Sequence, residues 1–125
     1  MNEREFQDAV VDIAKLYGWR VFHARAAGTN KGYRTPVAYD GKGYVDLTLV
    51  HPSGYIVFAE IKSAVGRLSD EQLAWGEMLT AVSGGIDKAL ESMDEMRVFY
   101  RLWRPRDGDE IVTLLSFGRV RQWTP

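Results

Sequence analysis

Two apolar segments joined by a short turn constrain this chain more than any other feature. Residues 44–50 and 55–63 are rich in aliphatic and aromatic side chains, and His51-Pro52-Ser53-Gly54 between them is typical of a turn. Apolar segments of this length, bounded by turn residues, predict two antiparallel β-strands that form a hairpin. We therefore expect the middle of the chain to form part of a β-sheet.

Three charged residues interrupt this apolar hairpin: Asp46, Glu60 and Lys62. Because side chains alternate between the two faces of a strand, Glu60 and Lys62 project from the same face. With a hairpin loop over residues 51–55, Asp46 lies directly across from Glu60 on that face. The pattern therefore predicts two neighbouring carboxylates with a lysine close by.

Neighbouring carboxylates repel each other unless a cation or a shared proton lies between them. A hard divalent cation such as Mg²⁺ meets that need, since it prefers oxygen ligands and is commonly bound by one or two carboxylates plus substrate phosphate. A lysine beside such a site orients the attacking water and neutralises charge on a phosphate, which favours phosphodiester hydrolysis. The alternative is a solvated sheet face on which Glu60 and Lys62 form a weak surface ion pair.

The remaining segments alternate between helical and strand patterns. The predicted elements are a helix over 3–17, a strand over 19–23, a long loop over 24–43, the hairpin, a helix over 69–82, a short helical piece over 86–94, a strand over 97–104 and a last helix over 109–115. This order predicts a single α/β domain over residues 1–125, with a central mixed β-sheet flanked by α-helices.

The composition of the chain limits the kinds of metal site and of binding partner that we expect. The chain has no cysteine and only two histidines, so a metal would be held mainly by oxygen; His23 and His51 are interpreted as a strand and a turn residue. No apolar run is long enough to span a bilayer, so we expect a cytoplasmic protein with no membrane partner. The formal net charge of −1 conceals basic stretches at 23–67 and 97–125 around an acidic one at 68–95.

Two more residues have both a structural and a functional interpretation. On a helical wheel Glu3 falls in the stripe of the apolar residues, whereas Glu5 lies roughly opposite; an acid in the first turn also favours the helix dipole. Gln72 stands three residues after Ser69, which makes it the second half of a capping box.

Six segments follow one another in the order of a known nuclease group. They are Glu3-Arg4-Glu5-Phe6-Gln7, Gly18-Trp19-Arg20-Val21, Gly43-Tyr44-Val45-Asp46, Phe58-Ala59-Glu60-Ile61-Lys62, Gly66-Arg67-Leu68-Ser69-Asp70-Glu71-Gln72 and Trp103-Arg104-Pro105-Arg106-Asp107. Together they resemble the VRR-NUC group of the PD-(D/E)XK nuclease superfamily, and the first two also resemble the start of archaeal Holliday-junction resolvases. One departure is Val45, which stands where the family usually has proline before the metal-binding aspartate.

The resemblance implies a restriction-endonuclease-like core and a metal-dependent DNA endonuclease that uses Mg²⁺ or Mn²⁺. It implies that Asp46 and Glu60 bind the metal and that the backbone carbonyl of Ile61 adds a ligand. Lys62 is then the catalytic lysine. Glu3 completes the acidic cluster, and the family places a glutamine at position 72 near the lysine and the substrate, so Gln72 joins the expected site.

The family includes stand-alone resolvases, so branched DNA is the expected partner and a homodimer, with one site on each chain, the expected assembly. The cations expected to contact DNA phosphates are Arg25, Lys31, Arg34, Lys42 and Arg67, although such residues also serve plain solubility. The alternatives are a flap or single-strand nuclease, and an inactive DNA-binding module in a replication or recombination assembly. No Gly-x-x-x-x-Gly-Lys-Ser/Thr loop supports a phosphotransferase.

Overall fold

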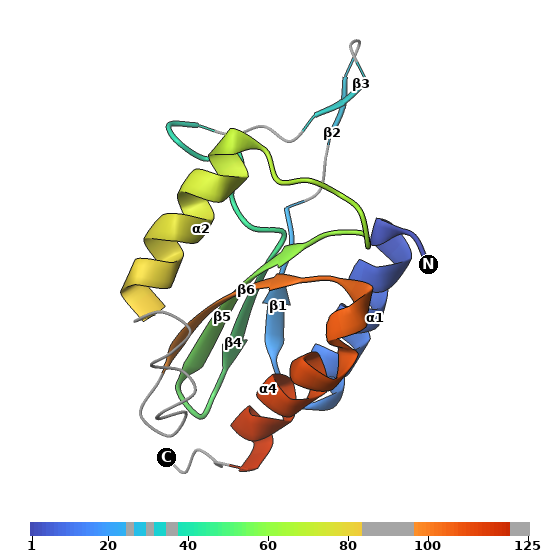
Figure 1. Ribbon diagram of the computed structural model, residues 1–125. Helices are drawn as coiled ribbons and strands as arrows, with labels where there is room; N and C mark the ends of the chain where they lie inside the picture. Colours follow the sequence, from blue (N-terminus) through green and yellow to red (C-terminus); the bar gives the residue numbers. More distant parts are fainter. Residues whose placement is uncertain (25–26, 30–31, 35–37, 84–96, 121–125) are drawn as a thin grey trace.

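The computed structural model describes residues 1–24, 27–29, 32–34, 38–83 and 97–120. They form a four-stranded mixed sheet in the order β1-β4-β5-β6, with helices on both faces, and a separate two-stranded sheet, β2-β3 (Figure 1). The elements are α1 (Glu3–Leu16), β1 (Arg20–Phe22), β2 (Ala27–Thr29), β3 (Gly32–Arg34), β4 (Leu47–His51), β5 (Tyr55–Ile61), α2 (Asp70–Ser83), β6 (Val98–Trp103), a 3₁₀ turn (Pro105–Asp107) and α4 (Gly108–Val120). The α/β class with a mixed sheet is confirmed.

The hydrophobic core lies between one face of the sheet and the pair α1 and α4. Alternate strand positions point into this layer, as the period of two requires. The buried side chains that meet there include Phe6, Val10 and Ala14 of α1, Leu47, Leu49, Val57, Ala59 and Ile61 of the sheet, and Ile111, Leu114 and Leu115 of α4. This packing leaves the other face of the sheet to α2, which lies alongside β6 (Figure 1).

The hairpin has the register that the sequence predicts. β4 and β5 are antiparallel, with Leu47 opposite Ala59 at the open end and His51 opposite Tyr55 at the turn. The turn is closed by the Gly54 N–H, which donates to the His51 carbonyl oxygen at 2.9 Å. One further step of the same register sets Asp46 opposite Glu60.

Strand β6 adds to the hairpin in the parallel direction, beside β5. Its last pair sets Ile61 beside Trp103, and the Lys62 N–H then donates to the Trp103 carbonyl oxygen at 3.0 Å. The ends of β5 and β6 therefore lie next to each other, at the same edge of the sheet as Asp46.

Helix boundaries are set by local caps. The Asn2 side chain accepts from the Glu5 N–H at 2.8 Å and so begins α1, a cap that the sequence interpretation overlooked. The predicted capping box of α2 is confirmed, because the Gln72 N–H donates to Ser69 Oγ at 3.2 Å and the Ser69 N–H donates to Gln72 Oε1 at 2.8 Å.

Two predicted elements need correction. The segment 24–43 is not one continuous loop, because it contains β2 and β3; three-residue strands are too short to leave a period in the sequence. The last helix begins at Gly108, one residue earlier than its predicted cap Asp109, and continues to Val120 rather than ending near Leu115. The helical piece predicted over 86–94 lies outside the described residues. Among the described helices, none has the length and apolar character needed to cross a membrane.

We expect Gly76→Ala to destabilise the fold, because a Cβ there would stand 2.6 Å from Tyr100 Oη and 2.9 Å from its Cζ. Alanine ordinarily favours a helix interior, so the expected loss of about 1–3 kcal/mol is the signature of overpacking. Urea unfolding measures it. Gly108→Ala, where nothing lies within 4 Å, is the matched control. Equal stabilities for the two variants, or no recovery when Tyr100→Phe is added to Gly76→Ala, would contradict this packing.

Candidate active site

Asp46 is held against the end of β5 by a backbone donor. The Ile61 N–H donates to Asp46 Oδ2 at 2.7 Å, so the carboxylate continues the β4–β5 ladder one step beyond its last backbone pair. A charge-assisted bond of this kind fixes both the position and the direction of the side chain. The expected role of Ile61 involved its carbonyl oxygen; that role stays a prediction, while its amide already positions Asp46.

Glu60 is a buried carboxyl group, with 1% of its surface exposed. Its Oε1 accepts from Gln72 Nε2 at 3.1 Å, whereas its Oε2 has no hydrogen-bond partner among the described residues. The pKa of Glu60 is raised from 4.5 to about 9, first by burial and next by the adjacent Asp46 side chain, while the charge of Lys62 partly opposes the shift. The carboxyl pair predicted from the hairpin is therefore present, and it lies in a site sheltered from solvent.

Gln72 forms the predicted helix cap and also contacts the carboxyl pair, while its expected place near Lys62 and the substrate stays a prediction. Its Oε1 caps α2 through the Ser69 N–H, and its Nε2 donates to Glu60 at the same time. A primary amide carries an acceptor and two donors on opposite atoms, so one side chain satisfies both. The start of α2 and the carboxyl pair are thus directly linked.

The remaining predicted site residues surround this pair less closely. Lys62 is half-buried, and its positive charge lowers the pKa of Glu60. Glu3 is exposed rather than turned into the core, and its negative charge is the weakest of the influences that raise the pKa of Glu60. Glu5 is also exposed.

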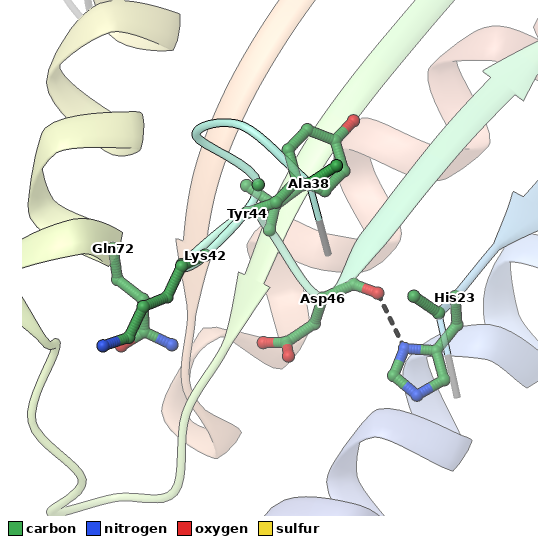
Figure 2. A pocket seen from close by; sticks show the side chains of 10 residues that line it. His23, Ala38, Lys42, Tyr44, Asp46 and Gln72 are labelled. Carbon is green, nitrogen blue, oxygen red and sulfur yellow. Dashed lines mark hydrogen bonds between the residues drawn. The ribbon is translucent and has the colours of Figure 1, made fainter. Parts of the chain in front are cut away.

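A pocket of about 430 Å³ opens beside Asp46 (Figure 2). His23, Lys42, Tyr44 and Gln72 are among its lining residues. His23 Nδ1 lies 2.8 Å from the Asp46 carbonyl oxygen; since a carbonyl only accepts, Nδ1 is the donor. The sequence interpretation gave His23 no role, and its contact with Asp46 could not be read from positions so far apart in the chain.

The chain enters the site through a glycine that a side chain would block. Gly43 has φ +82°, and a Cβ there would stand 2.5 Å from Glu71 Cβ and 2.8 Å from the Gln72 backbone nitrogen. Residues 41–46 can therefore pass directly over the start of α2. Tyr44 fixes this segment further, because its ring packs edge-on against Trp75 with centroids 5.0 Å apart.

Tyr100 of β6 belongs to the same surroundings, although the sequence did not point to it. Burial raises its pKa, and the negative charges of Glu60 and Asp46 raise it further. The alternation of β6 was visible in the sequence, but the parallel pairing with β5 that turns Tyr100 toward the carboxyl pair was not.

The predicted phosphate-binding cations are dispersed. Lys42 is exposed and its Nζ pairs with Glu71 Oε1 at 3.3 Å, at the rim of the pocket. Arg67 is exposed, in the segment that connects β5 to α2, and Arg34 is the last residue of β3. Arg25 and Lys31 lie outside the described residues. The structure brings Lys42 to the site and leaves the role of the other four a prediction.

The donor set suits a hard divalent cation. Within the described part of the chain, no group of three or more His, Cys, Asp or Glu side chains is arranged to hold a metal, so Glu3 does not close a triad with Asp46 and Glu60. A pair of carboxylates is nonetheless sufficient for Mg²⁺, which retains waters and takes further oxygens from substrate phosphate. The partnerless Glu60 Oε2 and the adjacent Asp46 fit that chemistry.

Comparison with protein-family models, with curated proteins and with solved structures found no match to this chain. The function proposed below is therefore inferred from the geometry of this site.

We expect the free energy of unfolding to fall as the pH rises from about 5 to about 9, because the folded chain keeps a proton on Glu60 that the unfolded chain releases. Glu60→Gln keeps an acceptor for Gln72 and removes this titration. The free energy of unfolding of Glu60→Gln, relative to that of the wild-type chain, should increase by at least about 1 kcal/mol between pH 5 and pH 9, since one pKa unit is worth about 1.4 kcal/mol. Urea unfolding at pH 5, 7 and 9 in chelator measures this, with Glu5→Gln as control. A constant difference between the two chains would contradict the raised pKa.

Proposed function

We propose that this chain is an endonuclease that hydrolyses DNA phosphodiester bonds with Mg²⁺ or Mn²⁺, on a restriction-endonuclease-like core. One observation carries the proposal: the buried Glu60, whose Oε2 has no hydrogen-bond partner among the residues that the structure describes, stands beside the oriented Asp46, and the charge of Lys62 acts on the same carboxyl group. The rival interpretation as a solvated surface pair is wrong for Glu60, which is 1% exposed; moreover, the ion pairs of the described residues do not include Glu60 and Lys62.

Each residue has a defined task in this proposal. Asp46 and Glu60 hold the cation, which when bound polarises the phosphate and lowers the pKa of an attacking water. Gln72 fixes the direction of Glu60, and the Ile61 N–H fixes Asp46. Lys62 orients the water and neutralises charge that develops on the phosphate. Glu3 lies at the edge of the site, where its carboxylate adds to the negative potential.

Branched DNA such as a four-way junction is the substrate we propose. Cutting two strands of a junction requires two sites, so a homodimer is the matching assembly, and sedimentation with and without junction DNA measures it. A flap or single-strand nuclease, and a DNA-binding module without activity, are outcomes that the following experiment distinguishes.

We expect the purified chain to cut labelled four-way junction DNA in Mg²⁺ or Mn²⁺ and to be inactive in chelator. Lys62→Ala should lower the single-turnover rate by at least about 100-fold, because a charge-stabilising group at the reacting phosphate is lost. Lys15→Ala removes a cation from an exposed position in the last turn of α1 and serves as control.

The choice of substrate then identifies the class of nuclease. Faster cutting of a flap or of single-stranded DNA than of the junction would show that the chain is a flap or single-strand nuclease and not a junction-resolving enzyme. Binding without cutting, in either metal, would leave only the DNA-binding module.

Metal binding has its own test, independent of cutting. We expect isothermal titration calorimetry to detect Mn²⁺ binding at one site per chain, and Asp46→Asn to weaken it by at least about tenfold, since an anionic ligand is lost. Asp40→Asn, at a nearby loop position outside the carboxyl pair, is the control. Equal affinities for the wild-type chain and Asp46→Asn would contradict a metal at this site.

A further inference from the structure

Arg104 occupies the position directly beside Lys62. It follows the last residue of β6 and keeps extended backbone angles, φ −122° and ψ 163°. β5 and β6 run in parallel with Ile61 beside Trp103, and the Lys62 N–H donates to the Trp103 carbonyl oxygen at 3.0 Å. The ladder thus continues past both strands, and its next pair is Lys62 and Arg104.

Both side chains project from the face that carries the carboxyl pair. Neighbours in register on adjacent strands point to the same side of a sheet, and alternate residues share a face. Glu60 pairs with Leu102, so Lys62 and Arg104, each two residues further on, extend the same face. Trp103 points the other way, into the core.

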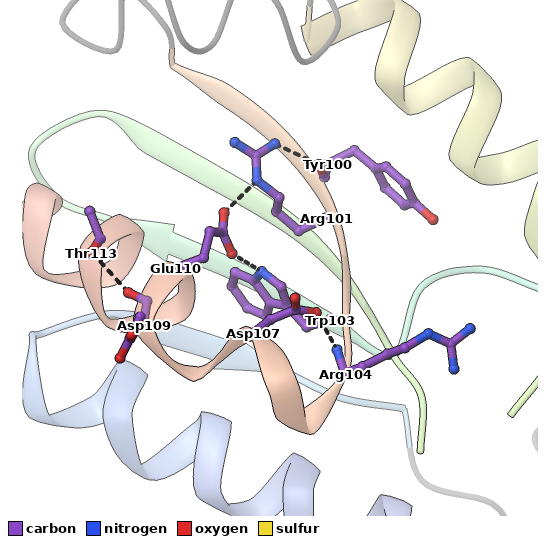
Figure 3. A network of polar contacts seen from close by, with 8 residues as sticks. All are labelled: Tyr100, Arg101, Trp103, Arg104, Asp107, Asp109, Glu110 and Thr113. Carbon is purple, nitrogen blue, oxygen red and sulfur yellow. Dashed lines mark hydrogen bonds and ion pairs between the residues drawn. The ribbon is translucent and has the colours of Figure 1, made fainter. Parts of the chain in front are cut away.

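The guanidinium group of Arg104 is anchored without being neutralised. Its Nη1 donates to the Ser63 carbonyl oxygen at 2.7 Å, and the residue is half-buried. The ion pairs formed within the described chain are Lys42 with Glu71 and Arg101 with Glu110, and neither involves Arg104. The nearby Asp107 carboxylate accepts from the backbone N–H of Arg104, while the guanidinium extends away from it (Figure 3).

The guanidinium group of Arg104 is suited to bind an anion that comes from outside the chain. A guanidinium has five N–H donors in a planar fork, and among the described residues its hydrogen bond is the one from Nη1 to the Ser63 carbonyl oxygen. Half-burial of an unpaired cation is unfavourable, so an anionic partner gains more there than at a fully solvated arginine. The fork matches two oxygens of a phosphate, and the anchor at Ser63 fixes it one strand away from the lysine of the site.

We propose that Arg104 is a substrate-binding residue that holds a DNA backbone phosphate at the site, next to Lys62. This inference rests on the proposed function, because it takes the substrate to be a nucleic acid. It also gives Arg104 a role beyond tying Ser63 in place. The two roles differ in one observable: only a phosphate contact changes how binding depends on salt.

The experiment compares Arg104→Gln, Arg104→Lys and the control Arg106→Gln, which removes the same charge from an exposed position in the following turn. Binding of fluorescein-labelled four-way junction DNA is measured in Ca²⁺ from 50 to 300 mM KCl, and cutting in Mg²⁺ under single-turnover conditions. Thermal unfolding verifies that each variant is folded.

We expect Arg104→Gln to reduce the slope of log affinity against log salt by about one, the loss of one phosphate contact, and to lower the cutting rate by roughly 10- to 100-fold. Arg104→Lys should restore the slope and only part of the rate, because it keeps the charge and loses the fork. Arg106→Gln should behave like the wild-type chain.

Each other outcome has a definite meaning. A wild-type slope for Arg104→Gln overturns the phosphate contact, whatever happens to cutting, and equal effects of Arg104→Gln and Arg106→Gln overturn it as well. If the wild-type chain binds but never cuts, and only Arg104→Gln lowers the slope, the nuclease proposal fails while the phosphate contact stands. If the wild-type chain neither binds nor cuts DNA, both proposals fail.

Discussion

The bond from the Ile61 amide to the Asp46 carboxylate is the contact on which the rest of the site depends. It replaces the next backbone pair of the β4–β5 ladder with a side chain, and so brings a charged group to the open end of a hairpin whose other residues are apolar. The register that begins at the turn sets Asp46 opposite Glu60, and the Ile61 N–H holds its carboxylate there. Two carboxyl groups are thereby kept together although their charges repel, and a buried proton or a cation is required between them.

The two faces of the sheet have different roles: one holds the hydrophobic core, and the other carries the polar residues of the candidate site. One face packs against α1 and α4 and holds nearly all of the large apolar side chains, among them Trp103, Phe99 and Leu47. That layer buries most of the apolar surface of the sheet, so the opposite face is able to carry polar groups at a cost in free energy. Helix α2 covers this second face only in part, and its buried residues are small: Gly76 and Ser83.

Helix α2 and strand β6 supply further residues that surround the carboxyl pair. Gln72 uses one atom of its amide to cap the helix and another to hold Glu60, so the helix start cannot shift without disturbing the site. The parallel pairing of β6 brings Tyr100 toward the carboxyl pair and Arg104 beside Lys62. Gly43 allows the chain to cross the start of α2 at close range, which places the pocket beside Asp46.

Features that depend on residues close together in the chain could be predicted from the sequence alone. Strand alternation and the length of the turn set Asp46 opposite Glu60, and the spacing of Ser69 and Gln72 set the helix cap, because both are decided within a few residues. The fold was needed to show that Glu60 is buried, that His23 contacts Asp46, and that Arg104 stands beside Lys62. These facts depend on segments that meet through the fold, and no local pattern records which strand will pair with which or what will cover a given face.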